Sequence, residues 1–130
     1  MQVLKTAFDA GADVLCLCDT TGDTMPMQAY EITKAVCEAL PDVEIGVHFH
    51  DDTGCAVANS LLAVNAGAVQ IQGTFLGFGE RCGNADLSVI IPDLYFKYGI
   101  DFPCDMRALK ATANQISEIS NVRIRSNKPY

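Results

Sequence analysis

The chain has 130 residues, 49% of them hydrophobic, and a formal net charge of −7 at pH 7. Its length is enough for a hydrophobic core but for no more than one ordinary domain. We expect neither nucleic acid nor a membrane as partner, because the charge is acidic and no apolar run approaches the roughly 20 residues of a membrane span.

Helix and strand patterns alternate along the chain. Three short apolar or β-branched runs predict strands at residues 14–18, 44–49 and 69–75. Amphipathic patterns predict a helix at the N-terminus and further helices at residues 26–40, 55–66, 86–99 and 105–120. Gly11 and Gly67 each follow a helix pattern and precede a strand, which is typical of the left-handed residue after a helix. Pro92 predicts a kink or a late start of its helix, and Asp105 an N-cap.

This alternation implies parallel βαβ units with right-handed crossovers. Three units cannot close an eight-stranded barrel. We therefore expect an α/β piece of a larger enzyme, cut at both ends.

Six cysteines occur, but none forms a Cys-x-x-Cys pair. The N-terminal residues lack the basic and apolar regions of a signal peptide. Reduced thiols in a cytoplasmic protein are therefore expected. Cys82 has no neighbouring base in the sequence, so we do not predict a catalytic thiol.

His48 and His50 follow each other at i and i+2 at the end of a predicted strand. Side chains two apart on a strand point to the same face, so both imidazoles can bind one divalent metal ion. Such a pair alone is weak evidence, because structural histidines are common. The loop after the first strand, residues 19–23, likewise has a plain interpretation as a polar turn that caps a helix.

The loop after the third strand is rich in glycine, which allows the backbone to approach a ligand. It is not a dinucleotide-binding loop, because Cys82 occupies the position of the last glycine in that fingerprint. Asn84 offers an amide oxygen that can join two imidazoles around a cation. Arg81 can pair with a carboxylate, either that of Glu80 or one on a substrate.

Four stretches carry a resemblance to a known family. They are residues 17–22, 46–60, 72–74 and 77–84, the last of which contains Gly-Glu-Arg-Cys-Gly-Asn. Together they resemble the catalytic barrel of the 2-isopropylmalate, citramalate and homocitrate synthases, in the DRE-TIM metallolyase superfamily. The form of the last motif is most similar to the citramalate synthase branch. Hydroxymethylglutaryl-CoA lyases of this superfamily lack the Gly-Glu-Arg motif.

The resemblance implies that residues 1–100 are the last three βα units of a TIM (β/α)8 barrel, followed at residues 101–130 by the helical start of a linker or subdomain. It implies a divalent cation (zinc, manganese or magnesium) bound by His48, His50 and Asn84. A further metal ligand and a catalytic arginine would lie upstream of this segment, and a histidine-bearing subdomain downstream. One departure is Asp51, at a position that is usually Asn.

The resemblance also assigns roles to the loops. Thr20 matches a threonine that contacts the 2-oxo acid, and no residue of the segment is a convincing general base. Four residues are expected to support the site rather than react. Asp19 supports its loop, Asp52 caps the next helix or braces a ligand imidazole, and Glu80 and Arg81 fix the third loop.

The implied activity is metal-dependent condensation of acetyl-CoA with a 2-oxo acid in branched-chain amino-acid biosynthesis. Pyruvate, which gives citramalate, is preferred over 2-oxoisovalerate, which gives 2-isopropylmalate. The full-length enzyme is expected to be a homodimer, and this segment alone to be inactive. Two alternatives stay open: an aldol-type lyase on the same scaffold, and a catalytically silent fragment that serves only folding or assembly.

Overall fold

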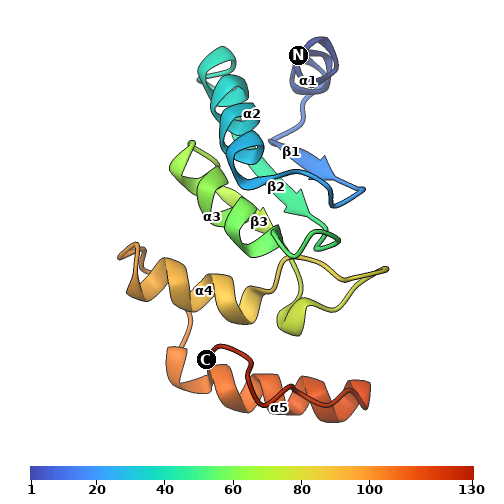
Figure 1. The fold of residues 1–130 in the computed structure, drawn as a ribbon. Coiled ribbons are helices and arrows are strands. Elements are labelled where there is room, and N and C mark those ends of the chain that lie inside the picture. Colours follow the sequence, from blue (N-terminus) through green and yellow to red (C-terminus); the bar gives the residue numbers. More distant parts are fainter.

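The computed structural model describes all of residues 1–130 and contains one sheet of three parallel strands. The strands lie in the order β1 (Val14–Asp19), β2 (Glu44–Phe49) and β3 (Gln70–Gln72). Cys18 lies opposite His48, and His48 lies opposite Gln72. Because the strands are parallel, their carboxyl ends meet at one edge of the sheet, where the following loops emerge (Figure 1).

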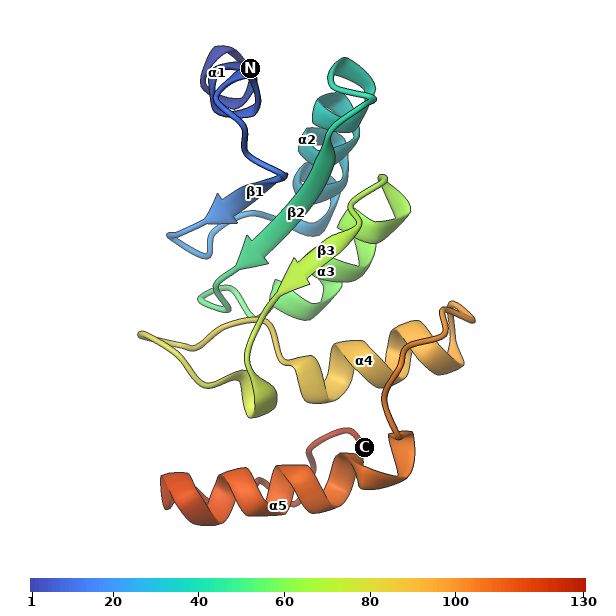
Figure 2. The same ribbon diagram turned by 180° about the vertical axis from the view of Figure 1, so that it is seen from behind.

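Helices cover one face of the sheet. In Figure 1 α2 and α3 lie in front of the strands, and in Figure 2 the strands lie in front of these helices, with no helix covering the near face. In both views α4 follows α3 in the row of helices, and α5 lies beyond α4. The helices are α1 (Gln2–Asp9), α2 (Pro26–Ala39), α3 (Ala56–Asn65), α4 (Leu87–Phe96) and α5 (Leu109–Ser120), with short 3-10 turns η1 (Phe75–Gly77) and η2 (Met106–Ala108).

The main core lies between the sheet and these helices. Val47 and Phe49 from β2 pack there with Ala56 and Ala63 of α3 and with Ile90 of α4. The two alanines are fully buried, and their small side chains let α3 lie close to the strands. Alternation along β2 therefore sends Val47 and Phe49 toward the helices and His48 to the opposite face.

The helix ends follow from local chemistry, as predicted. Pro26 occupies the first turn of α2, and the Met25 N–H donates to Gln28 Oε1 at 3.0 Å. Gly11 and Gly67 follow α1 and α3 with φ of +99° and +113°. The prediction of left-handed glycines after both helices is confirmed.

The third strand is shorter than its prediction of residues 69–75. It ends at Gln72, and Thr74 then makes an isolated parallel bridge with Asp86. The chain turns away through η1, where Leu76 has a φ of +63°. The strand ends early because the glycine-rich loop folds back on itself, and the residues after Gln72 form backbone hydrogen bonds with the returning part of the same loop.

Two helix predictions are also corrected. Pro92 does not delay its helix, since α4 begins at Leu87 behind Asp86, whose side chain accepts from the Ser88 N–H at 2.9 Å. Asp105 is an N-cap as predicted, but of η2, and α5 begins only at Leu109. No helix has the length and apolar character needed to cross a bilayer.

One buried amide joins α3 to the loop after β1. Asn59 is 1% exposed, and its Nδ2 donates to the Thr24 carbonyl at 2.7 Å. Replacing it with alanine would leave that carbonyl without its partner.

We expect Asn59→Ala to lower the free energy of unfolding by about 1–3 kcal/mol, the usual loss for a buried polar group left unpaired. Urea denaturation followed by circular dichroism measures this change. Asn65→Ala is the matched control on the same helix, because its hydrogen bond to Tyr98 is exposed. An Asn59→Ala variant as stable as Asn65→Ala would contradict the structural role of Asn59.

Candidate active site

The loop after β3 returns alongside the end of β2. His50 and Asn84 form an antiparallel bridge. The Asp51 N–H donates to the Gly83 carbonyl at 2.9 Å, and the Ala85 N–H donates to the Phe49 carbonyl at 3.0 Å. The structure thus brings Asn84 to the histidine pair, as the sequence predicted.

His48, His50 and Asn84, which we call the donor trio, present polar atoms that the protein does not use. Nδ1 of both histidines and Oδ1 of Asn84 are buried and have no hydrogen-bond partner. The two imidazole centroids are 5.2 Å apart. Asn84 Nδ2 donates to the Phe78 carbonyl at 3.0 Å, which leaves its oxygen as the free acceptor. Buried polar atoms without partners are unfavourable, so a ligand that pairs with all three would stabilise the site.

The chemistry of the trio fits a divalent cation. Imidazole nitrogen suits zinc, and an amide oxygen suits harder cations such as manganese or magnesium. No cluster of three or more His, Cys, Asp or Glu side chains that could hold a metal occurs in the chain. Two imidazoles and one amide therefore make a partial ligand set, which further ligands would complete.

Gly79 explains part of the glycine content of the third loop. A Cβ at this position would overlap the Asn84 side-chain amide. The backbone at residue 79 can approach the Asn84 side chain only because Gly has no Cβ.

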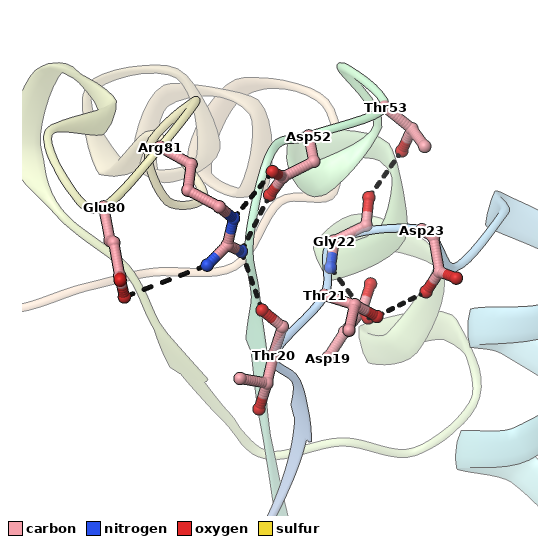
Figure 3. Close-up of polar contacts among 9 residues, drawn as sticks. All are labelled: Asp19, Thr20, Thr21, Gly22, Asp23, Asp52, Thr53, Glu80 and Arg81. Carbon is pink, nitrogen blue, oxygen red and sulfur yellow. Dashed lines mark hydrogen bonds and ion pairs between the residues drawn. The ribbon is translucent and has the colours of Figure 1, made fainter.

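Arg81 connects the three loops (Figure 3). Its Nε and Nη2 donate to the two Asp52 carboxylate oxygens at 2.8 and 3.0 Å, and Nη2 also donates to the Thr20 carbonyl at 2.7 Å. Glu80 is a weaker neighbour, with its carboxylate 3.8 Å from Nη1. Arg81 therefore joins its loop to the other two through Asp52 and the Thr20 carbonyl, and Glu80 contributes little to this contact.

The hydrogen bond with Arg81 lowers the pKa of Asp52, and the same bond raises the pKa of Arg81. A carboxylate whose folded-state pKa is lowered stabilises the fold above its ordinary pKa. That contribution is lost only as the pH falls through the lowered value. The pair is therefore fully charged at neutral pH.

The prediction that Asp52 caps the next helix or braces an imidazole is wrong. Cys55 is the N-cap residue of α3, and Asp51 rather than Asp52 supports the helix start, since its Oδ1 accepts from the Ala56 N–H at 2.9 Å. Neither imidazole is hydrogen-bonded to Asp52. The turn closed by Gly54 N–H to the Asp51 carbonyl points these adjacent side chains in different directions.

The loop after β1 is held by Asp19. Its two carboxylate oxygens accept from the N–H groups of Gly22 and Thr24, each at 3.1 Å. Thr20 engages Arg81 only through its carbonyl, and the residue is exposed. The polar-turn interpretation of this loop therefore holds, and the Thr20 hydroxyl stays available.

A pocket of about 360 Å³ lies beside Asn84, between the third loop and the C-terminal residues. Lys128 lines it and pairs with Asp86 at 2.5 Å, close to the Leu76 carbonyl at 3.3 Å. Lys128 was not among the predicted site residues. A single lysine so far along the chain from this loop forms no pattern that could have marked it.

Comparisons with known proteins show to which family the chain is related. Residues 1–116 match the HMGL-like family. The chain is 49% identical over its whole length to (R)-citramalate synthase of Aquifex aeolicus, of which it covers 25%. It is 37% identical, over 98% of its length, to 2-isopropylmalate synthase of Bacillus cytotoxicus, of which it covers 26%. The chain thus spans about a quarter of these curated relatives.

Among solved structures, HMG-CoA lyase of Bacillus subtilis superimposes with a TM-score of 0.80 and 27% identity, over 97% of this chain and 45% of that one. Three parallel strands with their helices therefore match part of a TIM-barrel domain. The chain belongs to the HMGL-like family.

Proposed function

We propose that this chain carries the metal-binding and oxo-acid-binding part of a synthase that condenses acetyl-CoA with a 2-oxo acid. The observation that carries this proposal is the donor trio, with its three buried, unpaired atoms. The trio adjoins the loop of Thr20, because the His50 N–H donates to the Asp19 carbonyl at 3.3 Å. The identity to citramalate and 2-isopropylmalate synthases supports the same reaction class.

A divalent cation (zinc, manganese or magnesium), bound by His48, His50 and Asn84, would polarise the carbonyl of the oxo acid as a Lewis acid. The chain's own residues do the positioning. Thr20 offers an exposed hydroxyl to orient the oxo acid. The group that removes a proton from the acetyl methyl lies outside these 130 residues. Hydrolysis of the thioester then releases CoA and a 2-hydroxy diacid.

Pyruvate is our preferred oxo acid, with 2-oxoisovalerate second. The higher identity to citramalate synthase, 49% against 37%, favours pyruvate. An aldol-type lyase is the second candidate, because the HMG-CoA lyase structure shares the fold. The Gly-Glu-Arg sequence at residues 79–81, whose arginine joins all three loops, favours the synthase.

We further propose that the three strands are the last three of the barrel, that a linker or subdomain begins near residue 101, and that the whole enzyme is a cytoplasmic homodimer. Upstream strands would supply the missing metal ligand.

Metal binding tests the donor trio. We expect His48→Ala and His50→Ala each to weaken the binding of zinc or manganese by about tenfold or more, because each removes one of few ligands. Isothermal titration calorimetry on the chain measures this. Gln72→Ala is the matched control, since Gln72 lies opposite His48 on β3 and is exposed. Unchanged affinity in both histidine variants would make these structural histidines.

Release of free CoA thiol tests the reaction. The chain alone should release none with either oxo acid. Extended with the flanking residues of the Aquifex aeolicus relative, it should release CoA faster with pyruvate than with 2-oxoisovalerate. Thr20→Ala should raise the KM for the oxo acid about tenfold, the effect of one lost hydrogen bond to a charged group. Turnover by the isolated chain would contradict the assignment of essential groups to other segments.

A further inference from the structure

We propose that Arg81 is a positioning residue for the oxo acid: it holds the Thr20 loop to the loop after β2 through Asp52. We call the contacts of Arg81 with Asp52 and Thr20 the clamp. The clamp is a feature of the fold, whereas its effect on the oxo acid rests on the proposed function.

The guanidinium of Arg81 is occupied by the protein. Nε and Nη2 are engaged with Asp52, and Nη2 also reaches the Thr20 carbonyl. Nη1 faces only Glu80, whose side chain is 80% exposed. The planar fork of an arginine suits such a bidentate contact, and a lysine at this position would keep the charge but lose the fork.

The backbone also directs the side chain. Arg81 has a φ of +56°, which is uncommon for a residue other than glycine. A turn closed by Gly83 N–H to the Glu80 carbonyl at 3.0 Å contains this residue. Strained backbone of this kind persists where the surrounding structure holds it, often at functional sites.

The loop after β2 is docked onto the loop after β1 without Arg81. Thr53 donates to the Gly22 carbonyl through both its N–H at 3.1 Å and its hydroxyl at 3.0 Å. Gly22 has a φ of +68°, and a Cβ there would overlap the Asp52 carboxylate. Asp52 is therefore an anchored partner, and Arg81 adds the third loop and fixes the Thr20 carbonyl to it.

This arrangement predicts that loss of Arg81 weakens binding of the oxo acid but not binding of the metal ion. Arg81 makes no hydrogen bond to the donor trio, so its loss should leave metal binding intact. It does hold the backbone of Thr20, so its loss should displace the hydroxyl that orients the oxo acid.

The test compares Arg81→Met, Arg81→Lys and Arg81→Gly. In the enzyme extended with the Aquifex aeolicus flanks, Arg81→Met should raise the KM for pyruvate about tenfold, with the KM for acetyl-CoA unchanged. Arg81→Gly, which relieves the backbone, should show the same rise if the guanidinium matters, and Arg81→Lys a smaller one. Metal affinity, measured on the chain by calorimetry, should match the wild type in all three.

Arg107→Met is the matched control. Arg107 makes the same bidentate contact, with Asp105 at 2.9 and 3.0 Å, but on an exposed turn away from the three loops. Its loss should change neither KM. A pyruvate KM unchanged in Arg81→Met, or a KM raised equally for both substrates, would overturn the positioning role.

Hydrogen exchange on the 130-residue chain separates this inference from the proposed function. The amides of Gly22 and Thr24 should exchange faster in Arg81→Met than in Arg107→Met. Faster exchange without any condensation by the extended enzyme would keep the clamp and reject the synthase. Unchanged exchange together with wild-type KM values would reject the clamp and keep the synthase.

Discussion

The site depends on one set of backbone hydrogen bonds, those that join the glycine-rich loop to the end of β2. Two hydrogen bonds hold this loop across the carboxyl ends of the strands: the Asp51 N–H donates to the Gly83 carbonyl, and the Ala85 N–H donates to the Phe49 carbonyl. Without them Asn84 would not meet the histidines, and Arg81 would not reach Asp52. Backbone hydrogen bonds of this kind do not depend on side-chain identity. What the sequence must supply is therefore the glycines, which permit the close approach of the loop backbone.

Two kinds of polar group meet at this edge and serve different ends. The Arg81–Asp52–Thr20 contacts are satisfied within the protein and rigidify the loops. The donor atoms of His48, His50 and Asn84 are left unsatisfied, although they are buried. Rigid loops around unpaired ligand atoms are the arrangement expected of a preorganised binding site. The loops are ordered by contacts within the protein, so a ligand would not have to supply the free energy of ordering them.

Sequence periodicity predicted β1, β2 and most helices, because local patterns and glycine or proline signals set them. The meeting of the strand ends near Thr20, His50 and Phe78 at one edge also followed, since parallel strands share an end. The Arg81–Asp52 pair did not follow, because its members are 29 residues apart and Glu80 is an adjacent competitor. The prediction chose Asp52 rather than Asp51 for the start of α3, because two adjacent aspartates precede this helix and the sequence does not show which of them reaches its first turn.

Asp51 supports the start of α3 and also lies beside the donor trio. Asn or Asp at this position can accept the Ala56 N–H, so the capping bond does not require the charge. An aspartate, however, also places a negative side chain beside the partial positive charge at the start of α3. The same residue lines the pocket beside Asn84. A negative side chain thus lies next to the donor trio, where it would add to the attraction of a divalent cation beyond the two imidazoles and the amide.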